Sequence, residues 1–222
     1  MFSNLIEIFV LSFVQGVSEF LPISSSAHLL IISKLKTFQS SSLEIDISLH
    51  LGSLLAIIFY FRKDLSGILK NKDLSLLIIL GSIPLIVAGF ILHKTGLINY
   101  LRNIEIIAWT TLMFGILLFF SDKFETKRNL NKDLNLKNIL IISCFQILAL
   151  IPGVSRSGII ITAGRFLKFN RYESSKISFY LSIPAIAGAS FLGLKDIFNQ
   201  NIEINSLVFL SIFLINILHL LL

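Results

Sequence analysis

Near the amino terminus the chain reads Gln15-Gly16-Val17-Ser18-Glu19-Phe20-Leu21-Pro22-Ile23-Ser24-Ser25-Ser26-Ala27-His28. This stretch carries an amide, a carboxylate, four hydroxyls and an imidazole, yet strongly apolar sequence surrounds it. Burying such groups in hydrocarbon costs several kcal/mol each unless they are hydrogen-bonded. Polar residues concentrated within membrane-like sequence therefore indicate a functional site.

The composition of the 222-residue chain is that of an integral membrane protein. Hydrophobic residues make up 55% and charged residues 14%, and the mean hydropathy is +0.85. The apolar runs are long and lack the alternation of barrel strands, so they predict an all-α polytopic fold. The net charge of +6 comes from Lys and Arg between these runs, which fits loops beside anionic lipid and requires no nucleic acid. The single cysteine, Cys144, excludes a disulfide framework and a cysteine-based metal site.

We expect about five or six full spanning helices and two interrupted segments. The spanning candidates are residues 47–61, 74–92, 104–120, 177–194 and 206–222. The interrupted segments are residues 5–21 with 23–32, and residues 139–151 with 158–167. The parts of the second segment are too short to span a membrane alone, and the breaks fall at Pro22 and Pro152. Broken apolar segments at corresponding places in two halves of a chain point to a binding site between repeats.

The two halves of the chain look related. Pro22 pairs with Pro152, and Ser24-Ser25-Ser26 pairs with Ser155-Arg156-Ser157, at a nearly constant offset of about 130 residues, which predicts an internal duplication. We therefore expect one membrane domain, residues 1–222, divided into the following parts: repeat 1 at about 5–70, a linking helical hairpin at about 74–120, and repeat 2 at about 139–205.

The basic residues predict the orientation of the chain. Residues 62–73, 121–138 and 165–176 are rich in Lys and Arg, so we expect them in the cytoplasm. The connection 33–46 then lies outside, and equivalent connections on opposite sides are typical of an inverted repeat. We therefore expect two re-entrant helix pairs, one dipping in from each side, whose tips meet inside the protein.

The second tip has the features of a phosphate site. A helix begins after Ser155, and the free N–H groups at a helix start bind anions. Arg156 adds a planar donor fork suited to phosphate, and Gly153 lets the backbone approach a ligand closely.

The first tip supplies the reactive groups that the second lacks. Glu19 is a candidate base or ligand of a divalent cation, and Gln15, four residues earlier, shares its helical face. Ser25 is a candidate nucleophile, and His28, three residues later, lies on the same face of a helix. Together with Arg156 these groups predict phosphoryl transfer.

Two motifs resemble those of the bacterial undecaprenyl-diphosphatase, or bacitracin-resistance, family. They are Gln15-Gly-x-x-Glu19-Phe-Leu-Pro-x-Ser-Ser-Ser-x-His28 and Pro152-Gly-x-Ser155-Arg156-Ser157-Gly158, and the resemblance covers roughly residues 5–195. It implies hydrolysis of undecaprenyl diphosphate to undecaprenyl phosphate and inorganic phosphate, which recycles the lipid carrier of peptidoglycan synthesis. It also implies roles in cell-wall biogenesis, cell shape and bacitracin resistance, a divalent cation (Mg or Ca), and a multi-pass place in the bacterial plasma membrane with the active site toward the outer side.

The resemblance also assigns roles to residues at the matching positions. The catalytic residues are Glu19, Ser25, His28 and Arg156. The substrate-binding residues are Gln15, Ser24, Ser26, Gly153, Ser155 and Ser157. Glu19 is the expected metal ligand, with Gln15 beside it. Whether Ser25, His28 or water attacks, which metal binds, and whether the protein is a monomer or a homodimer stay open.

Several expectations lie outside the motifs. The apolar walls for a polyprenyl tail would include Ser53, Ala56 and Phe179. Ile160 stands where many members of the family have Thr, and members usually continue beyond Leu222, so we expect a C-terminal region shorter than theirs. Packing or interfacial roles are expected for Glu7, His50, Glu105 and His219. A transporter or flippase of an anionic polyprenyl lipid is the alternative function, because inverted repeats with broken helices also form transporters.

Overall fold

The computed structural model describes residues 2–19, 21–36, 43–101, 103–199, 212 and 214. Almost all of the helix expected at residues 206–222 lies outside these ranges, as does His219. Within them the chain folds into helices without strands, apart from one isolated bridge between Arg128 and Phe169. The elements are α1 (Phe2–Ser18), α2 (Ser25–Lys36), α3 (Leu43–Tyr60), α4 (Arg62–Lys70), α5 (Lys72–Thr95), α6 (Leu97–Leu101), α7 (Ile104–Ser121), α8 (Leu130–Asp133), α9 (Leu136–Ile147), η1 (Leu148–Leu150), α10 (Arg156–Phe166) and α11 (Arg171–Asn199).

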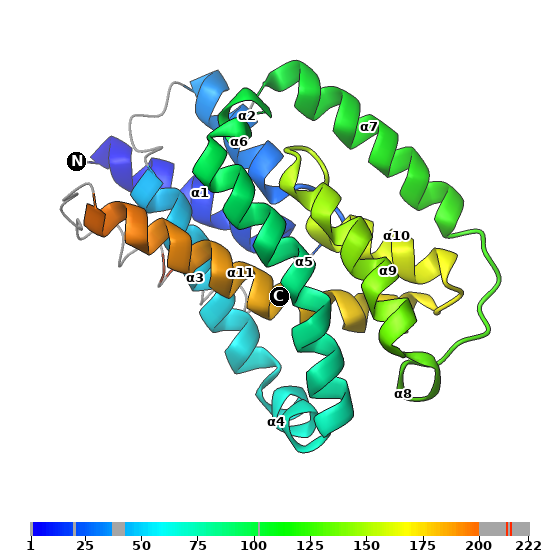
Figure 1. The fold of residues 1–222 in the computed structure, drawn as a ribbon. Helices are drawn as coiled ribbons and strands as arrows, with labels where there is room; N and C mark the ends of the chain where they lie inside the picture. Colours follow the sequence, from blue (N-terminus) through cyan, green and yellow to red (C-terminus); the bar gives the residue numbers. More distant parts are fainter. Residues whose placement is uncertain are drawn as a thin grey trace.

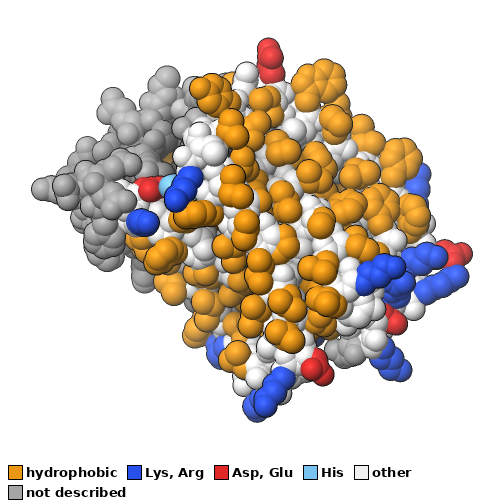
Figure 2. All heavy atoms as spheres, viewed as in Figure 1, with side chains coloured by type: hydrophobic (Ala, Val, Ile, Leu, Met, Phe, Trp, Pro, Cys, Tyr) orange, Lys and Arg blue, Asp and Glu red, His pale blue; other side chains and the backbone are white. Residues whose placement is uncertain are grey.

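Three helices in the described part of the chain are long and apolar enough to cross a membrane. They are α5, α7 and residues Arg171–Asp196 of α11, whereas α1, α3 and α9 contain shorter apolar stretches. Large hydrophobic side chains such as Ile79, Trp109 and Phe119 are exposed on α5 and α7, and Figure 2 shows hydrophobic side chains across most of this face. An apolar surface of this extent faces lipid, so the protein is an all-α membrane protein.

The second interrupted segment packs between α5 and α7 (Figure 1). α9 packs on α5, and α10 packs on α7 and α11. Gly81 permits the close approach of α5 to α9, because a Cβ there would lie 2.6 Å from Ile139. The Ser143 hydroxyl donates to the Gly81 carbonyl oxygen at 2.5 Å across the same contact. The two helices of the expected hairpin, α5 and α7, are therefore joined through α9 and α10.

The three basic connections lie at one end of the molecule. Arg171, at the start of α11, pairs with Asp122 after α7 at 2.5 Å. Lys176 lies 3.7 Å from Asp64 of α4. Arg165, in the last turn of α10, donates to the carbonyl oxygen of Asp122 at 2.7 Å. These contacts bring residues 62–73, 121–138 and 165–176 to the same side of the protein.

The tip between α9 and α10 lies near the opposite end of α7. Thr110 donates its hydroxyl to the Pro152 carbonyl oxygen at 2.7 Å, and Thr111 donates to the Gly153 carbonyl oxygen at 3.2 Å. α10 then leads back to the basic end, where Arg165 binds Asp122. The chain therefore runs out from the basic end through α9 and returns to it through α10.

Candidate active site

The two polar tips meet inside the protein. Arg156 Nη2 donates to Glu19 Oε1 at 2.5 Å, and both side chains are largely buried. The Ser157 hydroxyl donates to the Leu21 carbonyl oxygen at 2.5 Å, which ties the start of α10 to the first tip. Arg156 Nη1 also donates to the Ser182 carbonyl oxygen of α11 at 3.1 Å, and this contact fixes the direction of the guanidinium.

Glu19 is the centre of a hydrogen-bond network. Its Oε2 accepts from Gln15 Nε2 at 2.9 Å and from the Ser25 hydroxyl at 2.6 Å. Gln15 is fully buried, and its Nε2 also lies within hydrogen-bond distance of Ser53 Oγ on α3, at 3.4 Å. Gln15 therefore orients the carboxylate, as its spacing of four residues predicts.

The first tip separates Ser25 from His28. The Ser24 hydroxyl accepts from the Ala27 N–H at 3.4 Å, which caps the start of α2, and lies 3.2 Å from the Ser26 hydroxyl. The sequence predicts that Ser25 and His28 share a face, but Ser25 points to Glu19. His28 Nδ1–H instead donates to the Ser24 carbonyl oxygen at 2.6 Å, and its ring is exposed. His28 thus braces the backbone of the tip that carries Ser25.

The second tip is shaped by the residues around Arg156. The Ser155 hydroxyl accepts from the Gly158 N–H at 3.2 Å and so caps α10, as the sequence predicts. Gly153 has a positive φ of 92°, and a Cβ there would lie 2.7 Å from the Ile107 carbonyl oxygen of α7. The backbone at Gly153 therefore makes a close approach to α7. Gly153 and Ser157 fix the tip, while Ser155 and Arg156 face the cavity beside it.

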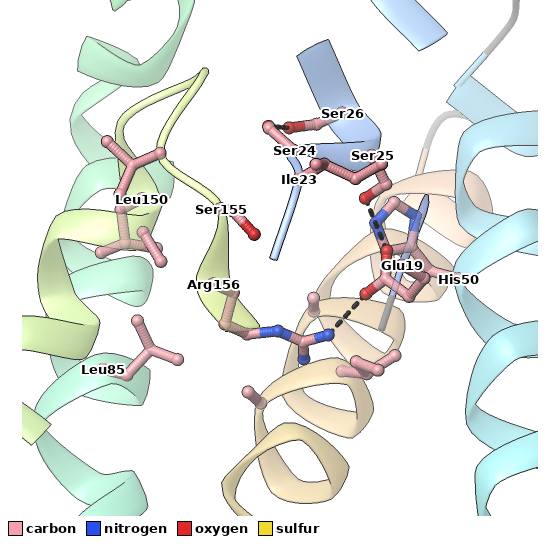
Figure 3. Close-up of a pocket in the computed structure, with 15 residues that line it drawn as sticks. Glu19, Ile23, Ser24, Ser25, Ser26, His50, Leu85, Leu150, Ser155 and Arg156 are labelled. Carbon is pink, nitrogen blue, oxygen red and sulfur yellow. Dashed lines mark hydrogen bonds and ion pairs between the residues drawn. The ribbon is translucent and has the colours of Figure 1, made fainter. Parts of the chain in front are cut away.

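A cavity of about 200 Å³ lies between the tips (Figure 3). Its polar wall consists of Glu19, Ser24, Ser25, Ser26, His50, Ser155 and Arg156. Its apolar wall consists of Ile23, Leu85, Ala149, Leu150, Val154, Ala185, Ile186 and Ala189. One side therefore suits a charged headgroup and the other suits hydrocarbon.

The residues expected to hold a polyprenyl tail pack elsewhere. Ser53 and Ala56 are almost wholly buried in the protein, and Phe179 packs against Phe61 with 5.0 Å between ring centroids. The apolar wall of the cavity comes instead from α5, η1 and α11. The sequence could not identify this apolar wall. Its residues come from helices that are distant in the chain, and the packing of those helices decides which side chains line the cavity.

Ile160, the departure from the family motif, lies in the protein core. It is completely buried in the cluster that includes Ile142, Ile159 and Leu181. Thr162 donates its hydroxyl to the Gly158 carbonyl oxygen at 2.8 Å within α10, so it does not replace a hydroxyl at position 160. Neither side chain lines the cavity.

His50 is a cavity residue that sequence reasoning missed. The sequence predicts a packing role for it, but the structure places it in the polar wall, beside Glu19 (Figure 3). The available signal was its position in the middle of an apolar segment, because an ionisable residue there indicates function by default. The same rule singled out Glu19, and His50 meets the same condition.

The oxygen atoms of Glu19 and Gln15 can bind a divalent cation only if the substrate provides further ligands. The part of the chain that the structure describes holds no group of three His, Cys, Asp or Glu side chains arranged to bind a metal. Among the described residues, Glu19 is the one carboxylate in the cavity wall, and Gln15 Oε1 is buried without a hydrogen-bond partner. Mg²⁺ is commonly held by one or two carboxylates together with water and substrate phosphates. Glu19 with Gln15 meets that pattern if a diphosphate supplies further oxygens.

Comparison with known proteins adds independent findings. The family model described as "Bacitracin resistance protein BacA" matches residues 8–220. An undecaprenyl-diphosphatase of Pelagibacter ubique (strain HTCC1062) is 60% identical over 213 residues, which cover 96% of this chain and 83% of that protein. Proteins with the same name from Elusimicrobium minutum (strain Pei191) and Alteromonas mediterranea (strain DSM 17117 / CIP 110805 / LMG 28347 / Deep ecotype) are similar as well. The first is 44% identical over 197 residues, covering 85% of this chain and 75% of its own. The second is 40% identical over 211 residues, covering 89% and 79%.

Proposed function

Because the chain belongs to the BacA family of bacitracin resistance proteins, we propose that it is a membrane enzyme that hydrolyses undecaprenyl diphosphate. The products are undecaprenyl phosphate, the lipid carrier of peptidoglycan synthesis, and inorganic phosphate. The observation that carries the proposal is the carboxylate of Glu19, which binds both Arg156 and the Ser25 hydroxyl where the two tips meet. A carboxylate, a hydroxyl and a guanidinium in one cavity are the groups that phosphoryl transfer needs.

The diphosphate binds at the polar wall of the cavity. The guanidinium of Arg156 is a donor fork matched to phosphate oxygens, and the helix starts at Ser25 and Arg156 favour an anion. In the free protein the guanidinium is paired with Glu19. Substrate phosphate therefore takes over part of this interaction, and the first isoprene units lie against the apolar wall.

The proposed nucleophile is the Ser25 hydroxyl, with Glu19 as its base. Their hydrogen bond of 2.6 Å is already set for proton transfer. The Ser25 oxygen bonds to the terminal phosphorus, its proton passes to Glu19, and the bond from phosphorus to the bridging oxygen breaks. Glu19 gives this proton to the departing undecaprenyl phosphate. Water then attacks the phosphoserine: one of its protons restores the Ser25 hydroxyl, and inorganic phosphate leaves.

The proposal includes a divalent cation, Mg or Ca, held by Glu19, the Gln15 amide oxygen and substrate phosphates. When bound, such an ion neutralises charge on the diphosphate. The protein itself contributes the orientation of Glu19, through the Gln15 amide and the Ser25 hydroxyl.

We also propose that the fold is an inverted repeat whose site opens to the outer side of the bacterial plasma membrane. Three basic connections at one end support a cytoplasmic position for that end. α9 and α10 leave that end and return to it, which supports a re-entrant pair. In the proposed duplication α1 corresponds to α9 with η1, α2 corresponds to α10, and α3 corresponds to α11. Whether the protein forms a homodimer is a separate question for experiment.

The direct test is phosphate release from undecaprenyl diphosphate by the purified protein in liposomes, with Mg or Ca and with chelator. The wild type should release phosphate, and a folded Ser25→Ala variant should lose most of this activity. Full activity of that variant would contradict the serine nucleophile and favour direct attack by water. Lipid translocation without phosphate release would contradict the hydrolase proposal and favour a flippase.

A further inference from the structure

Glu19 is approached by basic side chains from two different helices. Arg156 reaches it from α10 and donates at 2.5 Å. His50, on α3, lies beside the same carboxylate and interacts with it electrostatically. Figure 3 shows Arg156 and His50 on opposite sides of Glu19, and both side chains line the cavity. The place where a diphosphate would bind therefore has a possible donor on each side.

The other histidine of this region has a different position. His28 belongs to the motif, but its Nδ1–H donates to the Ser24 carbonyl oxygen, and its ring is outside the set of residues that line the cavity. Of the histidines that the structure describes, His50 is the one that lines the cavity. A neutral imidazole keeps one N–H donor and an imidazolium has two, so His50 can donate in either state.

The position of His50 is fixed by the packing of α3. Leu49 and Ser53, on either side of it in the helix, are completely buried. The Ser53 hydroxyl donates to the Leu49 carbonyl oxygen at 3.1 Å and lies 3.4 Å from Gln15 Nε2, so α3 is joined to the residue that orients Glu19. A side chain held on a rigid helix beside a reactive carboxylate is well placed for binding.

We propose that His50 is a second phosphate-binding side chain of the site. Its ring N–H donates to the diphosphate from the α3 side, while Arg156 binds from the α10 side. This inference rests on the proposed hydrolysis of a lipid diphosphate and adds to it a residue outside both sequence motifs. It also predicts that an amide side chain can serve at this position, because a Gln side chain also ends in N–H donors.

The test compares the kinetics of the wild type with His50→Ala, His50→Gln and His93→Ala. For His50→Ala we expect KM for undecaprenyl diphosphate to rise about tenfold, as for the loss of one hydrogen bond to a charged group. Its kcat should change less than KM. Inhibition by inorganic phosphate should weaken in parallel, and His50→Gln should restore KM to near the wild-type value. His93, an exposed residue paired with Asp196, is the matched control, and its variant should keep wild-type kinetics.

The outcomes separate this inference from the proposed function. If the wild type releases no phosphate, the proposed function fails. If the wild type is active and His50→Ala keeps the wild-type KM and phosphate inhibition, the role of His50 is overturned. Equal losses in His50→Ala and His50→Gln, at unchanged melting temperature, also overturn it, because the amide would then not replace the ring. If His50→Ala does not fold, His50→Leu is compared with His50→Gln, because the two side chains have similar volumes. His50→Leu should then raise KM and His50→Gln should not.

Discussion

Glu19 and Arg156 are a buried pair of opposite charges in an apolar protein. Two charges taken out of water gain little net stability from each other, but removal of one partner leaves the other uncompensated. The pair therefore adds little to stability. In the proposed function its guanidinium exchanges the carboxylate for a phosphate, while the Ser25 hydroxyl stays on the other carboxylate oxygen.

Part of this site can be predicted from sequence, and part cannot. Glu19, Ser25 and Arg156 were predicted because each lies in a dense polar motif, and the cap at Ser155 follows from the break before α10. The cavity position of His50 depends on the rotation of α3, which packing against other helices determines. A short motif contains no information about such packing.

Gly153 gives a stability prediction at the residue scale. Gly153→Ala should destabilise the protein by about 1–3 kcal/mol, because alanine is strained at positive φ and its Cβ would meet the backbone of α7. The measurement is thermal unfolding in detergent. Gly115→Ala on α7 is the control, since a Cβ there meets no atom within 4 Å, and it should be neutral or stabilising. Equal melting temperatures for the two variants would show that the contact between the second tip and α7 does not support the fold.

At the scale of elements, the end of α10 is fastened to the end of α7. Arg165 is 4% exposed, and its guanidinium donates to the carbonyl oxygens of Asp122, Phe124 and Phe169 at 2.7–2.9 Å. The charge patterning predicted only that this segment faces the cytoplasm. We call this contact of Arg165 with the three carbonyl oxygens the Arg165 clamp. It could not be predicted from the sequence, because its carbonyl groups belong to two separate segments of the chain.

We expect Arg165→Met to lower stability, because three backbone carbonyl oxygens would lose their donor, and the buried one, of Phe169, costs about 1–3 kcal/mol if it is left unsatisfied. Unfolding by heat, followed by circular dichroism, gives the comparison. Lys127→Met is the control, since Lys127 belongs to an exposed ion pair with Glu125 and exposed ion pairs contribute little. A larger loss for Lys127→Met than for Arg165→Met would argue against the clamp.

Asp122 adds a pH dependence to the same clamp. Its hydrogen bond with Arg171 lowers the pKa of the Asp122 carboxyl below its ordinary value of 3.8, and Arg165 lowers the pKa further, although partial burial opposes the shift. A lowered pKa in the folded state gives stability that is fully present above pH 3.8 and is lost as pH falls through the lowered value. Asp122→Asn should therefore be less stable than the wild type at neutral pH, and the difference should shrink in acid. Glu125→Gln, at an exposed ion pair, is the control, and its stability relative to the wild type should not change with pH in this way. If the stability difference between Asp122→Asn and the wild type is the same at neutral and acid pH, the proposed effect of the Asp122 carboxyl is wrong.

At the scale of the whole molecule, the sequence predicted helices, polar breaks and a basic side, because hydropathy and charge are local quantities. It could not predict that α9 and α10 lie between α5 and α7. The expected five to six spans compare with three sufficiently long apolar helices in the described part of the chain. α1 and α9 are short because each ends at a polar tip.

The proposed orientation can be measured by labelling single cysteines. In a Cys144→Ser background, Thr95→Cys lies at the end of α5 and Lys132→Cys lies in α8, beside the basic connections; both positions are exposed. A membrane-impermeant maleimide added to intact cells should label Thr95→Cys and leave Lys132→Cys unlabelled until the cells are opened. The reverse pattern would place the basic end outside and contradict the orientation.

The central claim is that the two tips form one diphosphatase site, and phosphate release by Arg156 variants tests it most directly. Purified wild type should release phosphate from undecaprenyl diphosphate, and Arg156→Ala should be slower by about 100-fold or more, as when one transition-state donor is lost. The double variant Glu19→Gln with Arg156→Met, which leaves no uncompensated charge, should fold and also be inactive. Near-wild-type release by either folded variant would contradict the account.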